Sequence, residues 1–289
     1  MTIKFWGTRG SIPVPGNSTT KYGGNTPCIQ VSNKSGEFII IDAGTGIREL
    51  GKDIIKNNHN KNITIFISHT HWDHIQGLPF FHPLYNEEYN VIIHSNTHEG
   101  MTFDHIIEAQ WHPVFFPVNK DILKANIKFE NIMAGKEYSI GNLRIETKNV
   151  HHSKGTLSFK ITQGEKSIVY MTDNEIRYNT ESAMPTMDSI LKHNSELISF
   201  CSNCDYLIHD AMYTLEEYSS KIGWGHSNNI AVAQFSMLAK VKNLVIFHYE
   251  PEYSDDKLDE LYSETKKILH DAYSQINCVA SRELFEIEV

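Results

Sequence analysis

The sequence lacks the features that would place the chain in a membrane or outside the cell. None of its 289 residues lies in a run approaching the roughly 20 apolar residues that a membrane-spanning helix needs. The N-terminal stretch MTIKFWGTRGSIPVPG has no apolar signal core and is broken early by Gly7. Four cysteines are too few for a disulfide framework, which fits a reducing compartment. We therefore expect a cytoplasmic protein that does not contact a membrane.

Positive charge is also scarce. The chain has 26 Lys and Arg residues against 35 Asp and Glu residues, which gives a net charge of -9. A protein that binds nucleic acid through phosphate contacts usually has a basic surplus. A long nucleic acid is therefore disfavoured as a partner, although a local basic patch is compatible with this composition.

No repeat, low-complexity tract or Pro/Gly/Ser-rich linker divides the chain, so residues 1–289 are expected to form a single domain. Short apolar runs that end in turn residues predict strands, several of them buried on both faces, over 3–6, 38–41, 63–67, 91–93, 143–147, 157–161, 168–171, 206–208 and 244–247. Apolar residues at helical spacing predict helices over 46–56, 103–110, 187–200, 228–240 and 255–274. This mixture indicates an α/β protein in which sheets lie between helical layers.

Histidine is unusually abundant, with 16 residues. Ionisable residues also follow several of the predicted strands directly. The strand-end residues are Asp42, His69, Asp173, Asp210 and His248. Sites on α/β scaffolds form at the rims where strands end. We therefore expect these side chains to share one rim.

Residues 68–74 read Ser-His-Thr-His-Trp-Asp-His and follow an apolar strand. His69, His71, Asp73 and His74 thus place four ligand-type side chains on a short loop, where a turn fans them around two metal ions. Divalent metals supply what hydrolysis at neutral pH needs, because they stabilise an oxyanion and lower the pKa of bound water from about 15.7 to about 7. Imidazole and carboxylate suit zinc, with manganese or iron as alternatives.

This segment resembles the signature of the metallo-β-lactamase-fold hydrolases, and the resemblance extends over nearly the whole chain. It implies an αββα sandwich of two mixed β-sheets flanked by helices. It also implies the ligands of two divalent metal ions: His69, His71 and His152 for the first, Asp73, His74 and His248 for the second, and Asp173 as a bridge between them. His151 competes with His152 for one position, and the spacing to the following Gly155 favours His152.

Two further loops, residues 209–214 (His-Asp-Ala-Met-Tyr-Thr) and 223–228 (Gly-Trp-Gly-His-Ser-Asn), resemble the paired loops of tRNase Z-like phosphodiesterases. The resemblance implies that Asp210 orients His226 and that His226 donates a proton to the leaving oxygen. Together with Asp73, these are the expected catalytic residues. The alternative for His226 is that it merely ends the loop before a helix opened by Ser227 and Asn228.

The N-terminal stretch, together with IIIDAGTG, resembles the subgroup that contains cyclic-nucleotide and cyclic-phosphate phosphodiesterases. Asp42 is expected either to support the metal loop through hydrogen bonds or to cap a turn. Arg9 is a candidate substrate contact that either touches a phosphate or pairs with a carboxylate. A lid-like insert is expected around residues 85–135, in which Trp111 and Phe115, with the neighbouring His112 and Phe116, either stack on a nucleobase or form the core of the insert.

The flexible Gly/Pro-rich arm with which tRNase Z enzymes grip tRNA is absent from this sequence. With the acidic charge, its absence shifts the expected substrate to a 3′,5′-cyclic nucleotide, hydrolysed to a nucleoside monophosphate by a hydroxide held between two metal ions. The alternatives are tRNase Z-like processing of RNA 3′ ends, a phosphoribosyl cyclic phosphate phosphodiesterase and a non-catalytic protein that sequesters a nucleotide. Enzymes of this kind are often homodimers, so a homodimer is expected.

Overall fold

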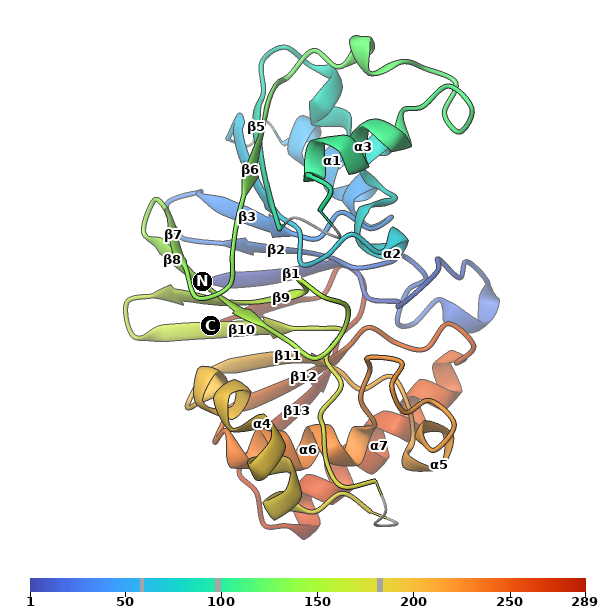
Figure 1. The fold of residues 1–289 in the computed structure, drawn as a ribbon, viewed down its shortest axis with the longest axis vertical. Helices are drawn as coiled ribbons and strands as arrows, with labels where there is room; N and C mark the ends of the chain where they lie inside the picture. The colour runs from blue at the N-terminus through green and yellow to red at the C-terminus, as the bar shows by residue number, and fades with distance from the viewer. Residues whose placement is uncertain (58–59, 97–99, 181–183) are drawn as a thin grey trace.

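Two seven-stranded β-sheets pack face to face, with helices on both outer sides (Figure 1). The computed structural model describes residues 1–57, 60–96, 100–180 and 184–289, and the strand counts refer to these ranges. The first sheet has the spatial order β14 (Glu286–Glu288), β1 (Thr2–Gly7), β2 (Cys28–Ser32), β3 (Phe38–Ile41), β4 (Asn62–Phe66), β5 (Asn90–Ser95) and β6 (Asn126–Asn131). The second has the order β13 (Asn277–Ala280), β12 (Asn243–Phe247), β11 (Tyr206–Asp210), β10 (Lys166–Met171), β9 (Leu157–Gln163), β8 (Leu143–Asn149) and β7 (Glu137–Ile140).

Both sheets are mixed. In the first sheet β14 to β3 pair antiparallel and β3 to β6 pair parallel. In the second sheet β7 to β10 pair antiparallel and β10 to β13 pair parallel. The carboxyl ends of neighbouring parallel strands meet at one edge of a sheet, so the parallel half of each sheet brings several strand ends together. This arrangement confirms the predicted fold class.

Strand β3 shows why the central strands read as unbroken apolar runs. Alternate residues of a strand point to opposite faces of its sheet. Ile39 and Ile41 pack in the core between the two sheets, whereas Phe38 and Ile40 pack against the helices that cover the first sheet. All four side chains are buried, so neither face of this strand tolerates a polar residue.

The helices form the two outer layers. The first sheet is covered by α1 (Ile47–Lys56), α3 (Phe103–Gln110) and the 3-10 helices η2 (Leu78–Phe80) and η3 (His82–Tyr85). The second sheet is covered by α4 (Met187–Cys201), α6 (Asn229–Leu238) and α7 (Asp255–Asp271). The remaining helical turns are α2 (Trp72–Ile75), α5 (Leu215–Tyr218), η1 (Asn17–Thr19) and η4 (Lys120–Ile122). All five predicted helices are present, α3 with the predicted bounds and the others with shifted ends, whereas α2 and α5 were not predicted.

The segment expected as an insert around residues 85–135 is partly built into the first sheet. Strands β5 and β6 are neighbours in that sheet, and the chain between them leaves it to form α3 and η4 (Figure 1). Residues 97–99 of this segment lie outside the described residues. The part that extends beyond the sheet is therefore shorter than the expected insert.

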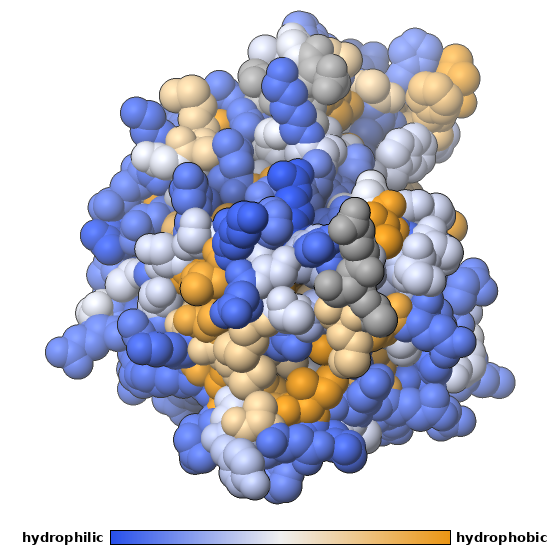
Figure 2. Space-filling view, turned by 60° about the horizontal axis from the view of Figure 1, so that its bottom comes forward, coloured by the Kyte–Doolittle hydropathy of each residue, from blue (hydrophilic) through white to orange (hydrophobic). Residues whose placement is uncertain are grey.

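The outer surface over the second helical layer is mostly hydrophilic. Figure 2 brings the bottom of the view in Figure 1 forward and shows polar residues around a smaller apolar area near the middle. Within the described ranges, no helix has both the length and the apolar character to cross a lipid bilayer. All four cysteines are buried free thiols.

Candidate metal centre

Three of the strand-end residues adopt a backbone conformation that is uncommon outside glycine. The φ angles are 62° for Asp42, 53° for Asp173 and 55° for His248, and these residues follow β3, β10 and β12. Non-glycine residues with positive φ are rare, and such backbone strain gathers at functional sites. The chain therefore turns sharply at the point where each of these strands delivers a side chain to the rim.

The short helix α2 explains how neighbouring residues 69 to 74 converge. His71 is extended at its N-cap position, and Asp73 and His74 lie within the helical turn. The amide nitrogen of His74 donates to the carbonyl oxygen of His71 at 3.0 Å, which closes that turn. The segment thus changes from extended to helical backbone, and its four side chains point into one space.

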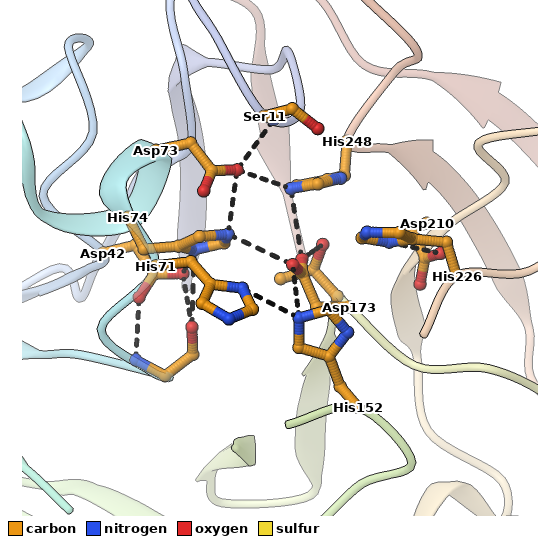
Figure 3. Close-up of polar contacts among 12 residues, drawn as sticks. Ser11, Asp42, His71, Asp73, His74, His152, Asp173, Asp210, His226 and His248 are labelled. Carbon is orange, nitrogen blue, oxygen red and sulfur yellow. Dashed lines mark hydrogen bonds and ion pairs between the residues drawn. The ribbon is translucent and has the colours of Figure 1, made fainter. Parts of the chain in front are cut away.

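The structure brings the seven expected ligands together in two groups (Figure 3). The first group is His69, His71, His152 and Asp173, and the second is Asp73, His74, Asp173 and His248. Within each group the ligand atoms all lie within 4.8 Å of one another. The members of these groups are those that the family resemblance implied, and Asp173 is shared by both.

Asp173 lies between the two groups and uses both carboxylate oxygens. Its Oδ2 is 3.4 Å from Nε2 of His69 and 3.4 Å from Nε2 of His74. Its Oδ1 is 3.1 Å from Nε2 of His248. Burial would raise the pKa of Asp173, but the surrounding imidazoles hold that pKa well below its usual range. The carboxylate is therefore ionised, which is the form that binds a cation.

The donor set fits a pair of divalent cations. Nε2 of His69 and Nε2 of His74 are buried and have no hydrogen-bond partner in the described structure. An unpartnered buried polar atom is costly, and a cation in each of the two groups would satisfy the nitrogen that belongs to that group. Imidazole nitrogen and carboxylate oxygen suit zinc, manganese and iron alike, so the chemistry of the residues does not select one metal.

Asp42 holds the metal loop from behind. Its Oδ1 accepts a hydrogen bond from the amide of Ser68 at 2.7 Å. Its Oδ2 lies 2.8 Å from Nδ1 of His74 and accepts a hydrogen bond from the hydroxyl of Tyr170 at 2.7 Å. A partner on one ring nitrogen orients a ligand histidine through the other nitrogen, so Asp42 directs Nε2 of His74 toward the centre. Of the two roles expected for Asp42, the structure supports the first.

Two glycines allow the backbone to approach ligand histidines closely. A Cβ atom at Gly10 would lie 2.5 Å from Nδ1 of His248, and one at Gly225 would lie 2.1 Å from Nδ1 of His152. Neither ligand could keep its position beside any larger residue. The backbone amide next to Gly10, that of Ser11, also donates to Oδ2 of Asp73 at 2.8 Å.

His226 and Asp210 lie together beside the two groups. Nδ1 of His226 is 3.5 Å from Oδ2 of Asp210, and the ring of His226 stacks on that of His248 with centroids 5.1 Å apart. Burial disfavours the charged imidazole, but the pairing with Asp210 and the negative charge of Asp173 outweigh burial and raise the pKa of His226 to about 8. Asp210 is fixed in turn by the amide of Ser227 at 2.9 Å. The helix that follows begins at Asn229 with Asn228 as its N-cap, so His226 is not part of the cap.

The prediction that Arg9 contacts a substrate is wrong. Its side chain is fully buried and donates hydrogen bonds to the carbonyl oxygens of Gly23 at 2.9 Å, Glu250 at 3.1 Å and Tyr253 at 2.7 Å. Its Nη2 lies 3.9 Å from Oδ1 of Asp255, and this is the carboxylate pairing that was expected as the alternative. Arg9 therefore ties the N-terminal loop to the segment after β12 and presents no group to solvent.

The aromatic candidates of the insert divide into core and surface. Trp111 is only 3% exposed and packs in the core with Phe103 and Ile107, so its predicted substrate contact is wrong and its alternative core role holds. Phe115 is 74% exposed and lines an apolar cavity beside α2. Phe115 is therefore accessible, and its role in substrate binding stays a prediction.

Several residues of the site were not singled out from the sequence. They are Tyr170, which supports Asp42, the amide of Ser11, and Glu175, which accepts hydrogen bonds from the 223–225 loop. His151 was the competing ligand, but it belongs to neither group, and its Nδ1 lies 3.3 Å from the carbonyl oxygen of Glu175. Ser11 contributes through its backbone amide, and the side-chain types in a sequence do not indicate such a contact.

Comparison with known proteins places the whole chain among proteins with this architecture. A family described as the beta-lactamase superfamily domain matches residues 38–249. Among curated relatives, the chain is 28% identical to Ribonuclease Z of Picrophilus torridus and 25% identical to Ribonuclease Z of Nitrosopumilus maritimus. These alignments cover 99% and 100% of this chain and 95% and 100% of the relatives.

Solved structures with the same fold are more distant in sequence. The metallo-beta-lactamase fold protein YhfI from Bacillus subtilis superposes with a TM-score of 0.72 at 15% identity, covering 100% of this chain and 99% of that one. The short form of human tRNase Z superposes with a TM-score of 0.62 at 16% identity, with coverage of 100% and 99%. At these identities the likeness establishes the fold.

Proposed function

Because the chain belongs to the beta-lactamase superfamily, we propose that its candidate metal centre hydrolyses phosphodiester bonds. The observation that carries this proposal is the pair of four-residue groups that share Asp173, with His226 and Asp210 beside them. Metal binding alone needs the two groups, whereas cleavage of an ester with a poor leaving group also needs a proton donor. His226 supplies a group of that kind next to the centre.

When bound, two divalent cations supply Lewis acidity and lower the pKa of a water molecule. The residues of the chain hold and orient the substrate and move the proton. Asp210 pairs with Nδ1 of His226, which leaves Nε2 to give a proton to the departing oxygen. Nδ1 of His152 donates to the carbonyl oxygen of Gly225 at 3.0 Å, and this contact turns Nε2 of His152 toward the centre.

RNA is the substrate that the relatives favour. The curated relatives are named Ribonuclease Z, and they match this chain over almost the full length of both proteins. We therefore place cleavage near the 3′ end of an RNA ahead of the 3′,5′-cyclic nucleotide that composition favoured. The relatives thus stand against the expectation that a long nucleic acid is disfavoured.

A 3′,5′-cyclic nucleotide is the second candidate, and a specific observation favours it. The alignment with the Picrophilus torridus relative extends over 322 positions, more than the 289 residues of this chain, so the relative contains residues that this chain lacks. The missing length agrees with the absence of a substrate-gripping arm from the sequence. The net charge of -9 also favours a small substrate with one phosphate over a polyanion.

The two candidates are tested with one preparation of metal-loaded protein. An RNA with a 3′ extension and a panel of 3′,5′-cyclic nucleotides are incubated separately, and the products are identified. RNA as the substrate predicts a cut near the 3′ end and a KM that rises steeply with salt, because phosphate contacts release counterions. A cyclic nucleotide as the substrate predicts a nucleoside monophosphate and a KM that changes little with salt. If every phosphodiester stays intact, the proposed function is wrong.

A further inference from the structure

A polar cleft of about 660 Å³ leads away from the metal centre on the side of the second sheet. His71 and His152, both members of the first ligand group, form its inner end. Its walls include His151, Arg177, His193 and the loop 222–225. The cleft therefore offers a substrate that reaches the metal centre further contacts, most of them with polar or cationic side chains.

Trp224 projects into this cleft from a loop that is held firmly. Glu175 accepts hydrogen bonds from the amides on both sides of the tryptophan, that of Gly223 at 2.7 Å and that of Gly225 at 3.1 Å. The hydroxyl of Tyr218 donates to the same carboxylate at 2.7 Å. Because the carbonyl oxygen of Gly225 also bonds to His152, the loop is fixed relative to the metal ligands. The backbone that carries the indole is therefore fixed next to the metal ligands.

Most of the Trp224 side chain faces solvent. The residue is 59% exposed, and Nζ of Lys221 lies 4.0 Å from the centroid of its ring. The ammonium group covers part of one face of the indole and leaves area for a second planar group. Stacking of bases on aromatic side chains beside cationic groups is a general mode of binding single-stranded nucleic acid. Arg177 gives the same cleft a positive charge that attracts phosphates.

The cleft lies on the same side of the metal centre as His226, the proposed proton donor. Gly225 directly precedes His226, so the Trp224 loop approaches the centre from the side on which His226 lies. A group that protonates the leaving oxygen lies on the leaving-group side of the phosphorus. We propose that Trp224 stacks on the nucleobase of the nucleoside that carries the leaving oxygen, and that the cleft is the subsite for this nucleoside. This inference rests on the proposed phosphodiesterase function and adds the side on which the base is bound.

The other exposed tryptophan near the centre provides a matched control. Trp72 is 77% exposed, belongs to α2 and lines an apolar cavity of about 420 Å³ together with Phe80 and Phe115. That cavity lies on the side of the first sheet and includes none of the residues that line the polar cleft. Trp72→Ala therefore removes an equally large aromatic group beside the same centre without touching the proposed subsite.

The test uses two oligoribonucleotides that differ only in the nucleoside bearing the leaving oxygen, which is either adenosine or an abasic ribose. With native protein, loss of the base is expected to lower kcat/KM about tenfold or more. Trp224→Ala should abolish this preference by lowering kcat/KM on the adenosine substrate alone, and Trp224→Phe should restore most of it. Trp72→Ala should keep the preference. Cyclic AMP, whose leaving oxygen also belongs to a base-bearing nucleoside, tests the same contact in a small substrate.

A preference for adenosine that persists in Trp224→Ala would overturn the inference, as would its loss in Trp72→Ala alone. If native protein cleaves neither the oligonucleotides nor cyclic AMP, the proposed function fails, and equilibrium binding of the same oligonucleotide pair decides the subsite separately. Tighter binding of the adenosine oligonucleotide that disappears in Trp224→Ala would then support the subsite. Equal binding of the two oligonucleotides to native protein would refute it.

Discussion

The backbone of Gly225 lies directly against the imidazole of His152. Its carbonyl oxygen accepts a hydrogen bond from Nδ1 at 3.0 Å, and a Cβ atom on its α-carbon would meet the same nitrogen at 2.1 Å. One glycine thus orients a ligand histidine and also leaves the space in which that histidine sits. The loop that carries His226 and the first ligand group are therefore one structural unit.

Replacing Gly225 by alanine should displace His152 and weaken the first ligand group. Gly223 is the matched control, since it has the same φ of 84° and an added Cβ there would meet no atom within 4 Å. Both alanine variants bear the same backbone strain, but only Gly225→Ala collides with the ligand. We expect Gly225→Ala to lose bound metal and at least tenfold in activity, measured by elemental analysis and turnover. Equal losses in the two variants would show that loop strain, and not the contact with His152, is the cause.

His226→Ala should slow cleavage about 10²- to 10⁴-fold when the leaving group is a ribose oxygen, because the proton donor is lost. The effect should shrink to a few-fold for a p-nitrophenyl ester, whose leaving group departs without protonation. Metal content should stay at the native level, because His226 belongs to neither ligand group. Turnover on both esters together with metal analysis checks this. An equal loss on both esters would rule out proton donation to the leaving oxygen.

Asp42→Asn should lower the affinity of the centre for metal about 10- to 100-fold, because Nδ1 of His74 loses its charged partner. Tyr170→Phe removes only the hydroxyl that donates to Asp42 and should have a smaller effect in the same direction. Titration against a chelator of known affinity measures both variants. Unchanged affinity in Asp42→Asn would mean that Asp42 serves the turn alone, which was the alternative role expected from the sequence.

Arg9→Met should destabilise the fold by about 3 kcal/mol, since three carbonyl oxygens lose a charged donor and each unsatisfied buried group costs about 1–3 kcal/mol before relaxation. The exposed Arg48→Met is the control and should change the free energy of unfolding by less than about 1 kcal/mol. Denaturant titration of the two variants gives the comparison. A rise in KM for Arg9→Met without a loss of stability would instead support the prediction that Arg9 contacts a substrate phosphate, which the structure contradicts.

The ligand set was predictable because four of its members lie within six residues. Metal binding is indicated within one short segment by the side chains of His69, His71, Asp73 and His74. The family resemblance supplied the ligands that lie further along the chain. The helical turn α2, which makes the four converge, was not predicted, since a four-residue turn has no apolar periodicity to detect. Strand β6 also escaped prediction, because it is largely exposed and has no apolar run.

The wrong predictions concern residues whose partners come from distant parts of the chain. Arg9 shows its charge in the sequence, but the carbonyl oxygens of Glu250 and Tyr253 that bind it are more than 240 residues away. Trp111 was expected either to stack on a base or to form the core of the insert, and it is buried in a cluster that also holds Ile47 and Ile63 from earlier in the chain. Trp224 was visible within the 223–228 loop, yet the position of that loop depends on Glu175, which only the fold brings to it.

The most direct test of the account is the metal content of the native chain. Protein prepared without chelator and dialysed against metal-free buffer is analysed for its elements, next to Asp173→Ala and His248→Ala. We predict two divalent cations per native chain, about one in His248→Ala, and severe loss of both in Asp173→Ala, because Asp173 belongs to both groups. A native chain that holds no cation after reloading, or an Asp173→Ala variant that keeps two, would contradict the account.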